Sequence, residues 1–249
     1  MELPSEILPA ELTIVIPSKN ESSNLPCLLR CISQQDYPHL ASTRVFVADA
    51  GSTDGTVELA LAFQDKLKVE IIPGGLPAVG RNNGARLATT PYLLFMDADI
   101  EFHDSTLLRR TMETMRRRHL QCLTVDIRCS NGNLIDHLIY FGNNAIQHFA
   151  SFTKPFATGM FMLFEKAKFD ELGGFNEKAL FAEDYLLSKN ISPLRFGICK
   201  GYILTSNRRF VKIGRFKMIR MFFRTMLNTF NEKWFLRDQH YWQDNTKKK

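Results

Sequence analysis

Apolar and polar stretches alternate at a regular spacing through the first hundred residues of the chain. Four short apolar runs, rich in β-branched and aromatic residues, predict buried β-strands. They cover residues 12–17, 43–48, 67–72 and 92–96. The amphipathic segments that separate or follow them predict helices at 24–36, 54–65 and 78–88. Strands that alternate with helices of about a dozen residues indicate βαβ units, so the sequence predicts an α/β fold with a mainly parallel sheet.

Polar residues gather where three of these predicted strands end. The segment 18–21 follows the first strand, Asp49 follows the second, and Asp97 and Asp99 follow the fourth. Ligands of open α/β sheets bind outside the carboxyl ends of the strands. The sequence therefore predicts one ligand site at this edge of the sheet.

The tripeptide Asp97-Ala98-Asp99 is the most informative of these motifs. Two carboxylates at the end of a buried strand are costly unless a cation lies beside them. Side chains two residues apart in an extended segment leave the same face, so both carboxylates can converge on one ligand. Mn²⁺ or Mg²⁺ suits oxygen ligands and leaves positions for diphosphate oxygens. The alternative is a solvated acidic loop after a strand.

The second predicted loop, 49–56, contains acids, glycines and hydroxyl residues. A carboxylate such as Asp49 can accept hydrogen bonds from a nucleobase or from ribose. The hydroxyl and acidic residues at 52–54 can equally cap the following helix. Arg81, expected near the start of the third helix, suits a phosphate oxygen, with a surface arginine as the alternative.

Composition limits the class of protein. The chain has 249 residues, 45% hydrophobic and 23% charged, which is typical of a globular protein with a sizeable core. No apolar run reaches the length of a membrane-spanning helix, and the N-terminus lacks the basic segment of a signal peptide. Five cysteines without a Cys-x-x-Cys pair favour a reducing compartment, so we expect a cytoplasmic protein.

The positive charge is concentrated at the C-terminus. The whole chain carries +6, whereas residues 207–249 carry twelve Lys/Arg against three acids, so residues 1–206 are net acidic. A nucleic-acid-binding protein would more often spread basic residues over its folded face, so we expect no nucleic-acid partner. We expect one domain at 1–210 and a basic amphipathic helical tail at 211–249.

A helix predicted over 214–236 carries one apolar stripe beside a basic strip. The stripe consists of Phe216, Ile219, Phe223, Met226, Leu227, Phe230 and Trp234. The basic strip consists of Lys217, Arg220 and Arg224. Such a helix can lie on an anionic membrane surface, or it can pack its stripe against the catalytic domain or a second subunit. The sequence leaves peripheral membrane contact and a homodimer open.

The order of these motifs resembles the nucleotide-binding half of the family 2 glycosyltransferases with the GT-A fold, a Rossmann-like sheet with flanking helices. The segments that carry the resemblance are 17–21, 49–55, 81–84, 97–99, 169–177 and 183–184. It covers about residues 11–210. It implies an inverting, metal-dependent transfer of a sugar from a nucleoside diphosphate. We favour a UDP-sugar as the donor and expect a glycan acceptor or, from the helix predicted over 214–236, a lipid-linked one.

The resemblance also implies roles for individual residues. The metal, Mn²⁺ or Mg²⁺, would bind Asp99, and the general base would be Asp184, with Glu183 as the next candidate. The residues expected to bind the nucleotide sugar are Pro17, Ser18, Asn20, Glu21, Asp49, Ser52, Arg81, Asp97 and Ala98.

Two departures from the family pattern limit these roles. Many members have Asp-Asp-Gly-Ser where this chain has Asp49-Ala50-Gly51-Ser52. The Gln-x-x-Arg-Trp motif of processive synthases is also absent, and residues 206–210 stand in that region, which favours a single sugar addition.

The chemistry of the acidic pair Glu183-Asp184 can be read independently of the family. The preceding apolar stretch, 179–182, can desolvate Asp184 and so favour a base. Acids at a helix start are the simple alternative. A catalytically silent nucleotide-sugar-binding or scaffold protein of the same fold remains the second hypothesis for function.

Overall fold

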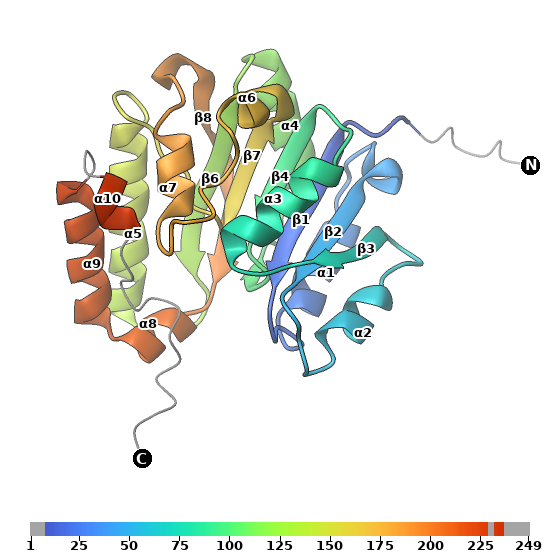
Figure 1. The fold of residues 1–249 in the computed structure, drawn as a ribbon, viewed down its shortest axis with the longest axis horizontal. Helices are drawn as coiled ribbons and strands as arrows, with labels where there is room; N and C mark the ends of the chain where they lie inside the picture. The colour runs from blue at the N-terminus through green and yellow to red at the C-terminus, as the bar shows by residue number, and fades with distance from the viewer. Residues whose placement is uncertain (1–7, 229–231, 237–249) are drawn as a thin grey trace, which may run out of the picture.

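The computed structural model describes residues 8–228 and 232–236, which form an eight-stranded sheet with helices on both faces (Figure 1). The strands are β1 Leu12–Ser18, β2 Arg44–Asp49, β3 Lys68–Pro73, β4 Tyr92–Met96, β5 Ile100–Glu101, β6 Cys122–Cys129, β7 Phe161–Glu165 and β8 Phe196–Thr205. The α-helices are α1 Leu25–Ser33, α2 Thr56–Leu61, α3 Pro77–Leu87, α4 Leu107–Arg117, α5 Leu134–Ala150, α6 Lys166–Glu171, α7 Glu183–Ser188, α8 Arg208–Ile213, α9 Arg215–Leu227 and α10 Glu232–Phe235. Two 3₁₀ turns, Leu40–Ser42 and Pro193–Arg195, complete the described elements.

The strand order is β3-β2-β1-β4-β7-β6-β8-β5. The first four strands pair in parallel, as the sequence predicted. The second half of the sheet is mixed: β7 runs antiparallel to β4 and to β6, whereas β6 and β8 are parallel. The mainly parallel half therefore holds the loops after β1, β2 and β4 at one edge.

The alternation of side chains along the strands separates two apolar layers. Ile14 and Ile16 of β1 face the layer covered by α1, α2, α4 and α5, whereas Val15 faces the layer covered by α3 and α6. Helix α3 lies very close to β1, because a Cβ at Gly84 would lie 2.4 Å from a methyl carbon of Val15. This close approach fixes the start of α3 beside the ends of β1 and β2.

The predicted strands agree with β1 to β4, but the helix predicted over 54–65 is shorter. It runs from Thr56 to Leu61, because Gly55 adopts the left-handed conformation at its start (φ +85°) and the Asp54 carboxylate accepts hydrogen bonds from Thr56. Residues 54 and 55 therefore belong to the loop and not to the helix.

The C-terminal helix leaves part of its predicted apolar stripe exposed. Its described parts are α9 and α10, and Phe216, predicted to belong to the packed or membrane-facing stripe, is 90% exposed. Ile219 and Phe223 are exposed as well, whereas Met218 and Met221 enter the core. At these positions the stripe is therefore not packed against the catalytic domain, and contact with a membrane or with a second subunit stays a prediction.

An ion pair at the start of α9 explains this orientation. The Arg215 guanidinium donates to both carboxylate oxygens of the fully buried Asp136, at 2.6 and 3.0 Å. Asp136 also accepts from the Asn207 side chain, so α5, α8 and α9 are joined at one point. Of the remaining stripe positions, Phe230 and the side chains of Met226 and Leu227 lie outside the described part of the structure.

Helices α5 and α9 lie side by side at one end of the molecule, far from β3 (Figure 1). Among the described residues, no helix combines the length and the apolar character needed to cross a bilayer.

Candidate functional site

The loops after β1 and β2 are held together by side chains that the sequence analysis selected. The Asn20 backbone N–H donates to the Ser52 hydroxyl at 2.8 Å, and the Asn20 side-chain oxygen accepts from the Thr53 N–H at 2.9 Å. Asn20 adopts a left-handed backbone conformation here (φ 53°), which asparagine tolerates better than most residues. The two loops therefore form one rigid edge.

Asp49 organises its own loop. Its carboxylate accepts from the backbone N–H groups of Gly51 and Ser52, both at 2.9 Å, and from the Ser52 hydroxyl. On the neighbouring strand β1, Ser18 is paired in register with Asp49, and Pro17 precedes it. The buried Ser18 hydroxyl has no hydrogen-bond partner among the described residues. The Asp49 contacts hold the turn of its own loop, and a contact with a nucleobase stays a prediction.

Asp97 and Asp99 each face an arginine. Asp97 accepts from Arg81 at 2.6 Å, and Asp99 accepts from Arg208 at 3.0 Å. Burial and then the neighbouring Asp97 charge raise the pKa of Asp99, whereas Arg209 and Arg208 act against them. Ala98 between the two acids is buried.

Arg208 is a site residue that the sequence analysis missed. It opens α8, and its guanidinium also donates to Glu21 of the first loop at 2.7 Å. Glu21 therefore shares a cation with Asp99, although 187 residues separate Glu21 from Arg208. The only signal in the sequence was the pair Arg208-Arg209 directly after a strand, in the region considered for the absent synthase motif.

Arg81 occupies a different environment from the one predicted. It is the fifth residue of α3 rather than its start, and its side chain is buried. Its two terminal nitrogens donate to Asp97 and to Glu183, both at 2.6 Å. Burial disfavours its charge, but these carboxylates and Asp184 outweigh burial and raise the Arg81 pKa. Arg81 thus ties the end of β4 to α7, and a contact with phosphate stays a prediction.

The acidic pair lies at the start of α7, as one reading of the sequence required. Ala182, the residue before it, has a left-handed backbone (φ 54°), an uncommon conformation for alanine. This turn aims Asp184 at Gly159, whose N–H donates to the carboxylate at 2.6 Å, and the Tyr185 N–H donates at 2.7 Å.

Burial and the Glu183 charge raise the pKa of Asp184 to about 6, although Arg81 and the two backbone donors oppose them. A carboxyl that ionises near neutral pH suits proton abstraction better than an ordinary aspartate does.

A divalent cation fits the acids that follow β4. Asp99 is a half-buried carboxylate beside a second carboxylate, and a cation would stabilise the charge that burial and the Asp97 carboxylate disfavour. No cluster of three or more His, Cys, Asp or Glu ligands occurs among the described residues. An ion here would therefore take few protein ligands and complete its shell with water and diphosphate oxygens, which is typical of Mg²⁺.

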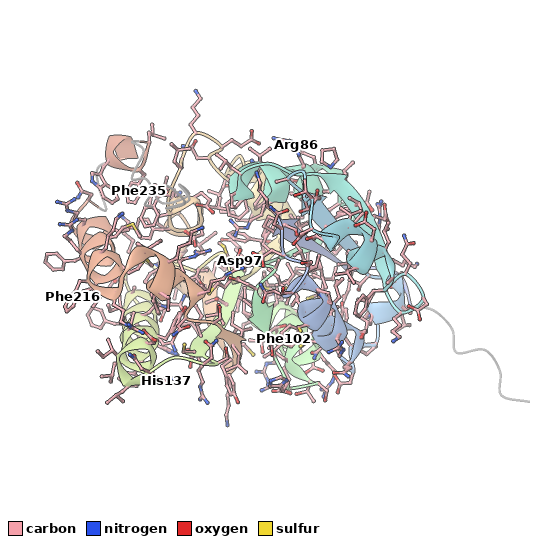
Figure 2. The ribbon with its side chains drawn as sticks, turned by 90° about the horizontal axis from the view of Figure 1, so that it is seen from below. Arg86, Asp97, Phe102, His137, Phe216 and Phe235 are labelled. Carbon is pink, nitrogen blue, oxygen red and sulfur yellow. The ribbon has the colours of Figure 1, made fainter. Side chains whose placement is uncertain are left out.

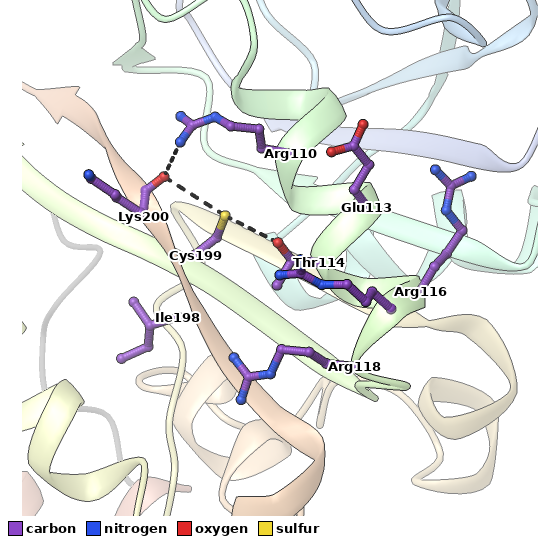
Figure 3. Close-up of a pocket in the computed structure, with 9 residues that line it drawn as sticks. Arg110, Glu113, Thr114, Arg116, Arg118, Ile198, Cys199 and Lys200 are labelled. Atoms are coloured by element: carbon purple, nitrogen blue, oxygen red, sulfur yellow. Dashed lines mark hydrogen bonds between the residues drawn. The ribbon is translucent and has the colours of Figure 1, made fainter.

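A cavity of about 450 Å³ reaches the acidic end of this site, where Arg81, Asp97, Glu183 and Asp184 line it. Figure 2 shows Asp97 near the centre of the molecule. A second hollow, of about 750 Å³, lies between α4 and β8 and is lined by arginines and Lys200 (Figure 3). It contains none of the residues selected from the sequence, so the candidate site is the first cavity with the adjoining strand ends.

The match with a known family agrees with this arrangement. The family described as Glycosyl transferase family 2 matches residues 13–173, which is more than half of the chain. The protein therefore belongs to glycosyltransferase family 2.

Curated relatives are similar over part of their length. 4,4'-Diaponeurosporenoate glycosyltransferase of Staphylococcus haemolyticus is 26% identical over 198 residues, covering 78% of this chain and 50% of that protein. Validoxylamine A glucosyltransferase of Streptomyces hygroscopicus subsp. jinggangensis is 34% identical over 93 residues, covering 36% of this chain and 22% of that protein. The chain thus matches half or less of the length of these relatives.

Solved structures confirm the GT-A fold. The mannosyltransferase PcManGT of Pyrobaculum calidifontis, in complex with GDP-Man and Mn²⁺, has a TM-score of 0.65 at 19% identity, covering 91% of this chain and 68% of that one. The S. aureus TarS fragment 1–349 has a TM-score of 0.62 at 18% identity, covering 85% and 65%. TarS is also known in complex with UDP-GlcNAc.

Proposed function

We propose that this protein transfers one sugar from a nucleoside diphosphate sugar to an acceptor hydroxyl, with inversion at the anomeric carbon. The observation that carries the proposal is the buried Asp184 carboxyl, with a pKa of about 6, in the same cavity as Asp97. The nucleotide sugars bound to TarS and PcManGT support a donor of this class, and we favour a UDP-sugar.

The donor would lie along the carboxyl ends of β1, β2 and β4. The rigid edge made by the loops after β1 and β2 presents backbone and hydroxyl groups for a nucleoside. At the end of β4, Arg208 supplies a positive charge beside Asp99 that can pair with a diphosphate oxygen. This arrangement supports nucleotide binding through residues Asn20, Glu21, Asp49, Ser52 and Asp97, as the sequence predicted.

Asp184 would act as the general base. Its carboxylate takes the proton of the acceptor hydroxyl while the acceptor oxygen forms a bond to the anomeric carbon. The bond from that carbon to the diphosphate breaks, and its electron pair leaves with the diphosphate oxygen. Glu183 is bound to Arg81 and so is less available to accept a proton.

Asp99 would hold Mn²⁺ or Mg²⁺. When bound, the ion supplies Lewis-acid stabilisation of the charge that develops on the leaving diphosphate. The Mn²⁺ in the PcManGT complex supports this assignment.

Replacing the base tests the proposal. Asp184→Asn should bind the donor within about twofold of the wild type and lose at least about 10²-fold in turnover. Asp170→Asn, at an exposed aspartate of α6, is the matched control and should keep its activity. An Asp184→Asn protein that retains most of its transfer would move the base elsewhere, with Glu183 the first candidate. A wild-type protein that neither transfers nor hydrolyses any of a panel of nucleotide sugars with Mn²⁺ would favour the silent binding protein.

We also propose a peripheral contact with the inner face of the cell membrane. The observation that favours it is an apolar face on α5 and α9, defined by the exposed side chains Leu134, Ile135, Leu138, Phe141, Ile146, Phe149, Phe216, Ile219 and Phe223. Figure 2 shows Phe216 at the outer edge of α9, directed away from the rest of the molecule. Exposed apolar patches of this kind mark interaction surfaces, and the neighbouring Lys217, Arg220 and Arg224 suit anionic headgroups.

A further inference from the structure

The cavity at the candidate site has two chemically different ends. At one end lie Arg81, Asp97, Glu183 and Asp184. From there the cavity extends between α5, α7 and α9, where most of its lining is apolar. Examples are Ile139, Ile146, Phe156, Met160, Phe181 and Ile219. Its volume of about 450 Å³ falls within the range of small-molecule sites, roughly 300–1,000 Å³.

We propose that this apolar part holds the hydrocarbon body of the acceptor, so that the acceptor is an alcohol with a lipid-like apolar body rather than a free sugar. The inference rests on the proposed function, because it takes Asp184 as the group that receives the acceptor proton. The acceptor hydroxyl lies at Asp184, and its apolar body lies between α5 and α9.

The few polar groups in the lining favour this class of acceptor over a sugar. A free sugar has several hydroxyls, and each one costs free energy when it is buried without a hydrogen bond. Apart from Arg209 and the four charged residues of the acidic end, the lining offers only scattered polar groups. Two of them, the Thr158 hydroxyl and the Asn143 amide nitrogen, are buried and have no hydrogen-bond partner among the described residues. Thr158 directly precedes Gly159, whose N–H donates to Asp184, so the Thr158 hydroxyl can orient the one reacting hydroxyl of an alcohol.

The cavity also opens toward an apolar surface. Leu138, Ile146, Ile219 and Phe223 both line the cavity and belong to the exposed apolar face of α5 and α9. An acceptor longer than the cavity can therefore extend onto this face and remain in contact with apolar side chains. A soluble glycan would instead leave these side chains in contact with water.

The transfer to such an alcohol is balanced. The acceptor O–H bond breaks and its proton goes to the Asp184 carboxylate, while the acceptor oxygen forms the new bond to the anomeric carbon. The bond from this carbon to the nucleoside diphosphate breaks, and the electron pair leaves on the diphosphate. The product is a glycoside with an apolar aglycone.

Gly142 offers a way to fill the cavity without disturbing the fold. It lies in α5, lines the cavity, and a Cβ built there meets no atom within 4 Å. Gly142→Leu should therefore occupy the space meant for the acceptor, and leucine favours a helix more than glycine does. Ala145→Leu is the matched control, because it adds a leucine to the same helix at an exposed position outside the cavity lining. Ile219→Glu, which places a charge at the exposed mouth, is a second variant that leaves the core intact.

The experiment measures binding of 1-decanol by calorimetry, and kcat/KM for 1-decanol and for methyl α-glucoside, with the full chain. We expect Gly142→Leu and Ile219→Glu to lower 1-decanol affinity and kcat/KM by about tenfold or more. Ala145→Leu should stay within about twofold. Donor affinity, measured separately, should not change in any of the three.

The outcomes separate this inference from the proposed function. If 1-decanol binds the wild type and Gly142→Leu weakens it, but no sugar is transferred to any acceptor, the cavity assignment stands and the proposed function fails. Equal 1-decanol affinity in the wild type and Gly142→Leu overturns the inference while transfer itself persists. A wild-type kcat/KM that is higher for methyl α-glucoside than for 1-decanol overturns it as well. A change of sedimentation coefficient in Gly142→Leu without any 1-decanol binding would assign the cavity to contact between two copies and would also overturn it.

Discussion

At the scale of single residues, the site is governed by how four carboxylates share two arginines. Arg81 is engaged by Asp97 and Glu183, and Arg208 is engaged by Asp99 and Glu21. The Asp184 carboxylate accepts hydrogen bonds from two backbone N–H groups, those of Gly159 and Tyr185. Burial and the Glu183 charge raise the pKa of Asp184 to about 6, so this carboxyl can take up a proton near neutral pH.

The raised pKa of Asp184 predicts the acid limb of the pH–rate profile, which is the fall of activity at low pH. A base works only when ionised, and burial together with Glu183 shifts the loss of the Asp184 charge up to about pH 6. We therefore expect kcat to be level above pH 7 and to fall about tenfold for each pH unit below 6. A pH–rate profile with saturating donor and acceptor measures this. A profile that stays flat down to pH 4.5 would rule out Asp184 as the titrating base.

Arg208 gives a second prediction at this scale. Its guanidinium lies 3.0 Å from Asp99 and competes with a metal ion for that carboxylate. Arg208→Gln should therefore bind Mn²⁺ alone about fivefold more tightly, since roughly 1 kcal/mol of repulsion at a half-exposed site is removed.

The same variant should bind a nucleoside diphosphate more weakly at saturating Mn²⁺, because one cation near the diphosphate is lost. Calorimetry measures both affinities, and Arg86→Gln, at an exposed arginine of α3, is the control. A weaker Mn²⁺ affinity in Arg208→Gln would show that Arg208 supports the metal site instead of competing with it.

At the scale of elements, the sequence predicts the strands and loops whose structure depends on a local pattern of residues. The strands β1 to β4 and the acids at their ends follow from short apolar runs and from the rule that ligands lie at carboxyl ends. The partners of Arg81 could not be predicted this way, because Glu183 lies 102 residues further along the chain and meets it only through tertiary packing. The buried face of α9 could not be predicted for the same reason. The ion pair between Arg215 and Asp136 sets the rotation of α9, and the spacing of apolar residues within α9 carries no information about a partner in α5.

The loop before β7 yields a prediction about how elements hold the site. Gly159 contacts both Asp184 and Arg81, and a Cβ there would lie 2.4 Å from the Arg81 guanidinium. Gly159→Ala should displace the buried Arg81 and lower kcat by roughly ten- to a hundredfold, because small shifts of positioned groups are costly. Since Arg81 lowers the Asp184 pKa, its displacement should also move the acid limb above pH 6.

This second effect separates positioning from general damage. A variant that merely loses stability would keep the acid limb where the wild type has it, and its activity would return at low temperature. The pH–rate profile of Gly159→Ala, measured well below its unfolding midpoint, therefore decides between the two. An unchanged limb with reduced kcat would mean that Arg81 stays in place.

At the scale of the whole molecule, polar and apolar surfaces are segregated around one cavity. The strand ends of the mainly parallel half supply the polar groups, whereas α5 and α9 supply apolar side chains on the other side of Asp184. The charge follows the same division, since the acidic part of the chain precedes residue 207 and the basic part follows it. The division of the chain at residue 210 stays a prediction, although Met218 and Met221 of α9 share the main core.

The last prediction concerns binding of the protein to a membrane surface and rests on the basic residues of α9. Lys217, Arg220 and Arg224 are exposed beside the apolar face, so each can interact with anionic headgroups and contribute about 1 kcal/mol at low salt. Replacing all three by glutamine should reduce flotation with anionic vesicles by more than tenfold and leave the thermal unfolding midpoint nearly unchanged, since none of them is buried. Raising the salt concentration should weaken the wild type in the same direction, because exposed charges are screened. Replacing Lys166, Lys168 and Lys189, which lie outside α5 and α9, is the control for total charge. If the wild-type protein does not float with anionic vesicles at low salt and instead sediments as a dimer, the apolar face joins two copies and the membrane contact is wrong.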